Sequence, residues 1–312
     1  MQEHAADLPT GVVQRLSEHY GARVRAWLDD VPELMTSVAE RWEIALSGYH
    51  DQGCASVVAT GRDRTGLLVV IKALPETARF RQERAALEHW AGERVCRLLD
   101  ADNECQVLLL ESVTDTAGGA TRPQNHPECV AKVLGRLHER PAPTNGPVPM
   151  LIDYYSRVVV PRISRRAARW GEIIEPAHVA RAVEISQDLC TDTRPRSMLH
   201  ADLHAENVLF DERGEPVIID PHAKIGSAAF DWAFWCVYYE PNAGFADRVH
   251  LCRQHAPGSA DEALAWAVTL AVDGALYYLD TNDQTAAAML AVLESPVLAP
   301  LLGRGKAAGR RM

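Results

Sequence analysis

The chain has 312 residues, of which 47% are hydrophobic and 24% charged, and its formal net charge is -10 at pH 7. This length can bury a substantial core in one large domain or two lobes. This negative charge argues against a nucleic-acid surface, which requires clustered positive charge, and no apolar run approaches the roughly 20 residues of a membrane span. Seven scattered cysteines without a C-x-x-C pair predict reduced, structural thiols.

We expect no secretion signal in the N-terminal segment, because MQEHAADLP lacks a basic stretch followed by an apolar one. We therefore expect a cytoplasmic protein with no membrane partner. Apolar side chains at helical spacing over residues 10–41 predict two or three helices, broken at Gly21 and at Pro32.

A hairpin follows these helices. Residues 42–47 have an extended pattern, Gly48 to Gly53 is predicted as a turn, and residues 55–59 as a second short strand. The turn, SGYHDQG, matches neither G-x-G-x-x-G nor G-x-x-x-x-G-K-[ST]. An ordinary turn and a phosphate-binding backbone therefore both remain open.

The next strand and helix carry one lysine and several glutamates. Residues 67–73, LLVVIKA, form an apolar run in which Lys72 is the one charge, and FRQERAALEHW reads as a helix with Glu83 early in it. A lone strand lysine usually faces solvent or lies on an edge strand. An ion pair with a helix glutamate would give Lys72 a function. Glu83 is one candidate for this partner, and Glu76 and Glu88 are the alternatives.

Two more strands are predicted over residues 95–99 and 106–110, and a loose stretch rich in Gly, Thr and Pro follows them. Such a linker after a run of strands is a candidate boundary between two parts of the chain. We place the boundary there, with an N-terminal lobe over residues 1–112 and a C-terminal lobe over residues 113–312.

The second half of the chain is predominantly helical in pattern. The basic cluster Arg162, Arg165, Arg166 and Arg169 is interpreted as a solvated helix face. Ser259 to Glu262 has the pattern of a capping box, and the tail GRGKAAGRRM lacks the apolar content of a folded segment. Helices are expected over residues 128–140, 151–170, 176–189 and 243–302.

Titratable side chains concentrate in residues 197–220, SMLHADLHAENVLFDERGEPVIID, where three apolar runs predict strand, loop, strand, turn, strand. Phosphoryl transfer from ATP needs a carboxylate that orients and deprotonates a hydroxyl, with an amide and a second carboxylate for magnesium. On this interpretation Asp202 is the base, and Asn207 and Asp220 are the metal ligands.

Other interpretations of this loop stay open. His200 and His204 together with Asp202 also suit a zinc or dinuclear hydrolase, because imidazole and carboxylate both bind such metals. A polar turn with satisfied hydrogen bonds, or a catalytically dead nucleotide-binding protein, are further alternatives. His204 stands two residues after Asp202, where an electrostatic role in catalysis is possible.

The run HADLHAENVL followed by IID resembles the catalytic loop and metal strand of the aminoglycoside phosphotransferases, antibiotic kinases with a protein-kinase-like fold. The leader, with AWLDDVPEL and ERW before a strand, is similar to the streptomycin 6-kinase and hydroxyurea-type branch. The resemblance implies a bilobal α+β fold, with a small antiparallel β-sheet lobe and a mainly helical C-terminal lobe. The segment FDWA resembles the family's D-x-A segment, in which Asp231 would anchor the catalytic loop through its backbone.

Further roles rest on this resemblance. Lys72, fixed by Glu83, would bind the nucleotide's α- and β-phosphates. Backbone groups of the hairpin that contains Gly48 and Gly53 would lie over the phosphates. Backbone groups near Glu111 and Val113 would bind the adenine edge.

The expected activity is therefore phosphorylation of a hydroxyl on a small molecule, with ATP or another nucleoside triphosphate and magnesium. We expect a cationic antibiotic, either an aminoglycoside of the streptomycin type or a basic cyclic peptide, and hence antibiotic resistance. An acidic cleft would attract such a cation, and the alternative substrate is a metabolite such as an amino sugar or a choline-like alcohol. The candidate acids are Glu206, Glu240, Asp247, Asp273 and Asp280.

Overall fold

The computed structural model describes residues 7–51, 53, 55–116, 118–191 and 196–303. It has the α+β architecture expected from the sequence, with one five-stranded antiparallel sheet and many helices. Within these residues, no helix is both long enough and apolar enough to cross a bilayer. The chain divides into two compact units, Met1–Gln124 with Leu209–Ile219 and Asn125–Val208 with Asp220–Met312. The lobe boundary after residue 112 stays a prediction.

The first unit is built on the five-stranded sheet, whose strand order is β1-β2-β3-β5-β4. All neighbouring strands are antiparallel, and β3 is the central one. Gly48 lies inside β1, so the predicted turn begins later than expected, because a bulge after Leu46 lets the strand continue to Tyr49. The strands are β1 Ala45–Tyr49, β2 Val57–Arg62, β3 Leu68–Ala73, β4 Leu98–Asp102 and β5 Val107–Glu111.

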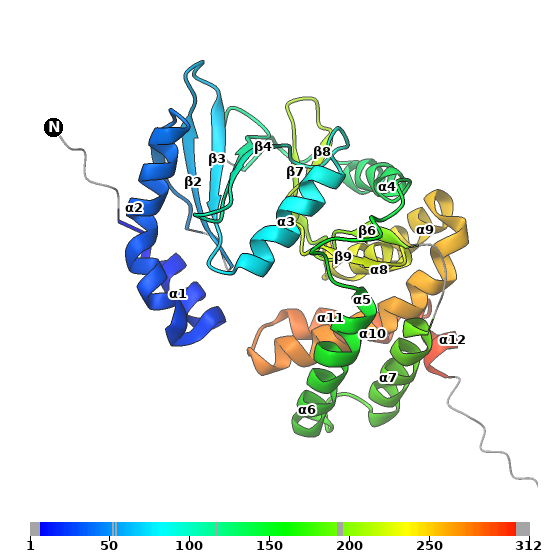
Figure 1. Cartoon of the computed structure of the whole chain (residues 1–312). Coiled ribbons are helices and arrows are strands. Elements are labelled where there is room, and N and C mark those ends of the chain that lie inside the picture. The colour runs from blue at the N-terminus through cyan, green and yellow to red at the C-terminus, as the bar shows by residue number, and fades with distance from the viewer. Residues whose placement is uncertain (1–6, 52, 54, 117, 192–195, 304–312) are drawn as a thin grey trace, which may run out of the picture. The chain divides into compact units, whose positions relative to one another are not determined.

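The helices α1 (Thr10–Tyr20) and α2 (Arg25–Arg41) pack against this sheet (Figure 1). The predicted break at Gly21 is present as a short 3₁₀ turn, Gly21–Val24, but the predicted break at Pro32 is wrong. Proline removes one helical hydrogen bond. The helix continues through it because the apolar face of α2 is buried in the core of the unit.

The second unit is helical around α10, which is buried along most of its length (Figure 1). The π-helical segment η2 (Tyr155–Val159) joins α5 to α6, so residues 151–170 form one continuous helical stretch. Ser259 lies at the N-cap of α10, but its side chain makes no capping hydrogen bond, so the predicted capping box is wrong. The helices of this unit are α4 His126–Leu137, α5 Leu151–Tyr154, α6 Val160–Trp170, α7 Pro176–Cys190, α8 Ala229–Tyr238, α9 Phe245–His255, α10 Ala260–Asp280, α11 Thr285–Leu293 and α12 Ala299–Leu302.

The titratable stretch folds as the three predicted short strands. β6 (Ser197–Leu199) pairs with β9 (Lys224–Gly226), and β7 (Val208–Phe210) pairs with β8 (Pro216–Ile218). The turn that joins β7 to β8 is held by Asp211, whose carboxylate accepts two backbone N–H groups.

The remaining helix of the first unit, α3 (Thr77–His89), follows β3 directly. The predicted disorder of the C-terminal tail concerns residues 303–312, of which residues 304–312 lie outside the described residues.

Candidate functional site

The loop between β6 and β7 brings three of the predicted site residues together. The Asn207 amide nitrogen donates to the Asp202 carbonyl oxygen at 2.8 Å and to Asp202 Oδ2 at 3.1 Å. His204 Nε2 lies 3.5 Å from the same Oδ2. A one-turn 3₁₀ helix, η3 (Ala205–Asn207), brings Asn207 back toward Asp202. The predicted base and the predicted amide ligand are therefore in direct contact.

The electrostatics of this loop keep Asp202 ionised. Burial raises the pKa of Asp202, but the hydrogen bond from His204 and the nearby histidine charges outweigh it, so the pKa lies below its ordinary value. Burial lowers the pKa of His204, whereas Asp202 and Glu206 raise it to about 9. At neutral pH the loop thus pairs a carboxylate with an imidazolium.

Asp231 anchors the same loop from α8. Its carboxylate is fully buried and accepts the backbone N–H groups of His200 and Ala201, each at 2.8 Å. The predicted anchoring role is confirmed. His138 Nε2 also lies 2.9 Å from this carboxylate, a partner that sequence reasoning missed because His138 follows α4, far away in the chain.

The two predicted metal ligands both fit a hard cation. The Asn207 amide nitrogen is used by Asp202, and no hydrogen bond to the amide oxygen is found within the described part of the chain. Asp220 follows β8 with φ at 57°, a conformation that non-glycine residues rarely adopt and that clusters at functional sites. An amide oxygen and one carboxylate are ligands that magnesium accepts beside phosphates and water.

A hydrolase centre would need a different cluster. Among the described residues, no group of three or more His, Cys, Asp or Glu side chains is placed to hold a metal ion. His200 is fully buried in the loop, and His204 lies within 3.5 Å of Asp202, Glu206 and Asn207. His204 therefore contacts the predicted base and the predicted amide ligand within the loop.

Lys72 and Glu83 form a buried ion pair in the first unit. Lys72 Nζ donates to Glu83 Oε1 at 2.6 Å, and the two side chains are only 6% and 1% exposed. The competing glutamates have other partners, since Glu76 pairs with Arg23 and Glu88 with Arg84. The pair links the central strand β3 to α3, and charges so deeply buried are retained only where they are paired.

The glycines predicted for phosphate binding lie at the hairpin of the first unit. A side chain at Gly53 would place its Cβ 2.4 Å from the Ser56 carbonyl oxygen, so the turn requires glycine there. Gly48 has open space around it. Neither observation distinguishes a phosphate-binding turn from an ordinary one.

The residues predicted to bind the adenine edge are not equivalent. The Glu111 N–H donates to the Arg97 carbonyl at 3.0 Å, and the Glu111 carboxylate accepts the Arg97 N–H at 2.8 Å. Val113 lies beyond the end of β5 and is half-buried. Val113 is therefore the better placed donor, because the Glu111 N–H is already used within the sheet.

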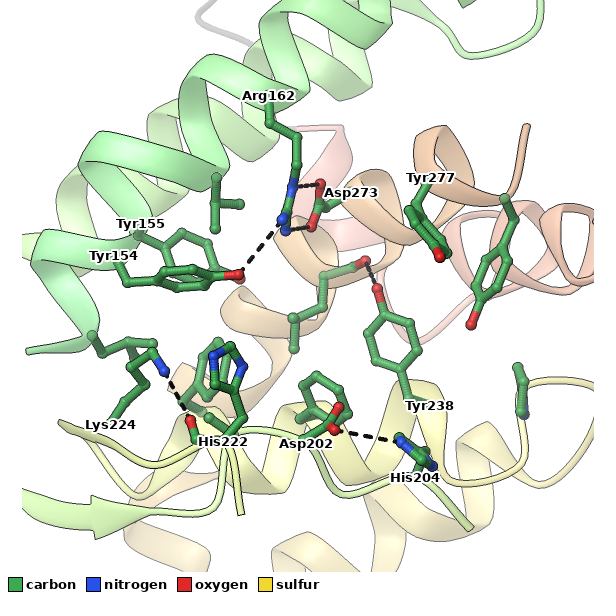
Figure 2. A pocket seen from close by; sticks show the side chains of 18 of the residues that line it. Tyr154, Tyr155, Arg162, Asp202, His204, His222, Lys224, Tyr238, Asp273 and Tyr277 are labelled. Atoms are coloured by element: carbon green, nitrogen blue, oxygen red, sulfur yellow. Dashed lines mark hydrogen bonds and ion pairs between the residues drawn. The ribbon is translucent and has the colours of Figure 1, made fainter. Parts of the chain in front are cut away.

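A pocket of about 470 Å³ opens at Asp202 within the second unit (Figure 2). Side chains from α5, η2, α6, α8 and α10 line it together with the catalytic loop. Sequence reasoning named Asp202, His204, Glu206 and Asp273 from this lining but assigned no role to its aromatic side chains. Among the described residues its aromatic members are Tyr154, Tyr155, Phe230, Phe234, Tyr238, Tyr277 and Tyr278.

Arginines of α6 pair with two acids of α10, and Arg162, Arg166 and Asp273 line this pocket. Arg162 Nε donates to Asp273 Oδ1 at 2.9 Å, and Arg166 Nε donates to Asp280 Oδ2 at 2.9 Å. Trp170 Nε1 also donates to Asp280 at 2.8 Å. The interpretation of this cluster as a solvated face is therefore wrong for Arg162 and Arg166, and Asp273 and Asp280 are not uncompensated acids. The sequence did contain a signal for this pairing. Asp273 and Asp280 lie seven residues apart on one helix face, a spacing that also occurs among the arginines of α6.

Comparison with known proteins extends these observations. The family described as "Aminoglycoside/hydroxyurea antibiotic resistance kinase" has a model that matches residues 41–256. Streptomycin 6-kinase from Streptomyces griseus is 27% identical over 238 residues, which cover 72% of this chain and 72% of that protein. Hydroxyurea phosphotransferase from Kitasatospora aureofaciens is 23% identical over 226 residues, with 72% and 66% covered.

Solved structures agree on the fold. The crystal structure of a choline kinase from Streptococcus pneumoniae is similar with a TM-score of 0.57, over 86% of this chain and 98% of that one. The two sequences are 12% identical in this superposition. The architecture is thus that of the kinase-like phosphotransferases, as the resemblance implied.

Proposed function

Because this chain belongs to the aminoglycoside/hydroxyurea antibiotic resistance kinase family and is a phosphotransferase, we propose that it transfers the γ-phosphoryl group of ATP to a hydroxyl of a small antibiotic. The observation that carries the proposal is the contact between Asp202 and Asn207 on a loop held by Asp231. That arrangement places an ionised carboxylate beside an amide in a pocket large enough for a small molecule.

Asp202 would accept the hydrogen bond of the acceptor hydroxyl and so align its oxygen for attack. With a pKa below the ordinary value, Asp202 is a weak base. A weak base suits a loose phosphoryl-transfer transition state, in which the hydroxyl proton leaves late. The main contribution of Asp202 is then orientation, with proton acceptance as the new bond forms.

Asn207 and Asp220 would hold magnesium, and the Lys72–Glu83 pair would bind the nucleotide phosphates. When magnesium is bound, it neutralises negative charge on the phosphates. Glu83 keeps the Lys72 ammonium in one position by a 2.6 Å hydrogen bond. Val113 would donate its backbone N–H to the base of the nucleotide, and the hairpin with Gly48 and Gly53 would contribute backbone groups to the phosphates.

The acceptor that we propose is an antibiotic with cationic groups, of the streptomycin type, in a cytoplasmic resistance reaction. Support comes from the relatives, which include streptomycin 6-kinase and hydroxyurea phosphotransferase. The five acids named from the sequence no longer support it equally, since Asp273 and Asp280 are paired with arginines. Glu206 lies at the pocket with its side chain 81% exposed, and its carboxylate is 2.8 Å from His204 Nδ1.

The direct test is to incubate the purified chain with ATP and magnesium and a panel of acceptors. The panel contains streptomycin, hydroxyurea, a basic cyclic peptide, an amino sugar and choline. We expect ADP release and transfer of one phosphate group to streptomycin or a related antibiotic, detected by mass spectrometry. Turnover of the amino sugar or choline alone would instead establish a metabolite kinase, and ATP-independent hydrolysis would contradict the proposal.

A further inference from the structure

Helix α1 contacts the turn between β1 and β2, which belongs to the hairpin proposed to lie over the nucleotide phosphates. Arg15 Nε donates to the Gly53 carbonyl oxygen at 3.3 Å, and Arg15 Nη2 donates to the Asp51 carbonyl oxygen. The same Nη2 lies 3.1 Å from the Asp51 carboxylate. The Tyr20 hydroxyl donates to the Ala55 carbonyl oxygen at 2.9 Å. Two side chains of one helix thus bind three carbonyl groups of the turn.

The packing of α1 on the sheet explains why these side chains reach the turn. Apolar side chains that recur every four residues along α1 are buried in one core with side chains of β2 and β3. Gly11 and Arg15 each precede a member of this stripe by one residue, on the side of the helix that contacts the turn. A side chain at Gly11 would have to displace the Asp51 carboxylate, so the helix and the turn approach closely there. The buried members of the stripe are Val12, Leu16 and Tyr20.

The turn lies next to the strand position that carries Lys72. The His50 N–H donates to the Val58 carbonyl oxygen at 2.8 Å and closes the hairpin. Val58 in turn lies opposite Lys72 in the register of β2 with β3. All of these residues belong to the first unit. The contacts from α1 therefore act on the backbone beside the lysine proposed to bind the phosphates.

The direction of the carbonyl groups decides whether such a turn can bind an anion. Backbone N–H groups attract a phosphate, whereas a carbonyl oxygen, with its partial negative charge, repels it. Arg15 and Tyr20 hold the carbonyls of Asp51, Gly53 and Ala55 toward α1. The turn is then ordered before the nucleotide arrives, which lowers the entropy cost of binding. The Arg15–Asp51 ion pair is partly exposed and adds little stability, so the contacts to the carbonyls are the important ones.

Resting on the proposed phosphotransferase function, we propose that Arg15 and Tyr20 are positioning residues for the nucleotide. They hold three carbonyls of the turn toward α1, so that the turn presents its N–H groups to the phosphates. Both residues act through the turn and not by contact with the nucleotide. On this proposal α1 has a function in nucleotide binding beyond its packing against the sheet.

Calorimetric titration with two probes, ATP with magnesium and adenosine, tests this role. Arg15→Met keeps the aliphatic part of the side chain and removes its donors, and Tyr20→Phe removes only the hydroxyl. We expect each change to weaken ATP about threefold to tenfold, the effect of losing one or two hydrogen bonds. Adenosine has no phosphate, so its affinity should stay unchanged. Arg25→Met, at an exposed arginine of α2, is the matched control and should change neither affinity.

Kinetics and amide hydrogen exchange separate positioning from a general loss of stability. In Arg15→Met and in Tyr20→Phe, the KM for ATP should rise by the same factor as the dissociation constant. The kcat at saturating ATP and the KM for the acceptor should stay unchanged. Amide hydrogen exchange should become faster in the peptide that carries Asp51 and Gly53. A variant that is merely less well folded would instead lose kcat and would bind ATP and adenosine less well to the same degree.

Several outcomes would overturn the positioning role. They are unchanged ATP affinity in both variants, equal losses of affinity for ATP and adenosine, and unchanged amide exchange in the turn. An Arg25→Met effect as large as that of Arg15→Met would overturn it as well. If the variants weaken ATP as expected but no acceptor is phosphorylated by the wild-type protein, the proposed function fails and the positioning role stands.

Discussion

The Asp231 carboxylate accepts the Ala201 N–H at 2.8 Å, at a residue whose φ is 59°. The next residue along the chain is Asp202. The left-handed conformation at an alanine costs free energy, and a fully buried carboxylate with two backbone N–H partners offsets that cost. Asp231 thus fixes the direction in which Asp202 enters the pocket, without touching a substrate itself.

Replacing Asp231 by alanine should therefore lower both stability and turnover. Two buried N–H groups would lose their acceptor, and we expect the free energy of unfolding to fall by about 3 kcal/mol, measured by urea denaturation. Asp261→Asn, at an exposed acid in the first turn of α10, is the matched control and should change little. An Asp231→Ala protein as stable as wild type would show that the loop does not depend on this anchor.

Variants of the Lys72–Glu83 pair should show whether the pair serves only the stability of the fold or also the turnover of the enzyme. Lys72→Met removes the 2.6 Å ion pair of Glu83 while its carboxylate stays buried, so the free energy of unfolding should fall by about 3–5 kcal/mol. The double variant Lys72→Met with Glu83→Leu should regain most of this stability, because two apolar side chains of similar volume fill the site. Turnover should stay low in both variants if Lys72 binds phosphate. Recovery of turnover in the double variant would mean that the pair is structural only.

Removing a metal ligand should affect nucleotide binding only when metal is present. Asp220→Asn should weaken binding of ATP with magnesium far more than binding of ATP in EDTA, measured by calorimetry. Asp211→Asn, at a turn carboxylate bound by Arg94 and two backbone N–H groups, controls for damage to the hairpin. Equal losses with and without magnesium, or stoichiometric zinc that survives dialysis, would contradict the magnesium assignment.

Much of the fold was predictable because it depends on local patterns. Apolar runs located the strands of the sheet, and shorter apolar runs located β6, β7 and β8. The helix break predicted at Pro32 was wrong because the packing of the apolar face of α2 outweighs the lost hydrogen bond. The rule that proline ends a helix uses only neighbouring residues and does not include tertiary packing. The Ser259 capping box failed for a related reason, since a 3₁₀ turn, Pro257–Ser259, precedes the helix and Ser259 takes helical dihedral angles.

The site was predictable only where its residues share one loop. Spacing alone paired Asp202 with Asn207, and the strand lysine and helix glutamate were found through their neighbouring elements. The pocket wall escaped because Arg162 and Asp273 lie 111 residues apart and meet only through the packing of α6 against α10. Taken one at a time in the sequence, each of these charges was expected to face solvent. In the folded chain the arginine and the aspartate pair and neutralise each other.

The most direct test of the account is the turnover of Asp202→Asn with the best acceptor, ATP and magnesium. Asparagine keeps the shape of the side chain but cannot accept the hydroxyl proton, so kcat should fall by about 10² to 10⁴, while ATP still binds. Glu212→Gln, at an exposed acid in the neighbouring turn, should retain full turnover. An Asp202→Asn protein that keeps more than about a tenth of wild-type kcat, a loss far below the usual general-base effect, would contradict the role assigned to Asp202.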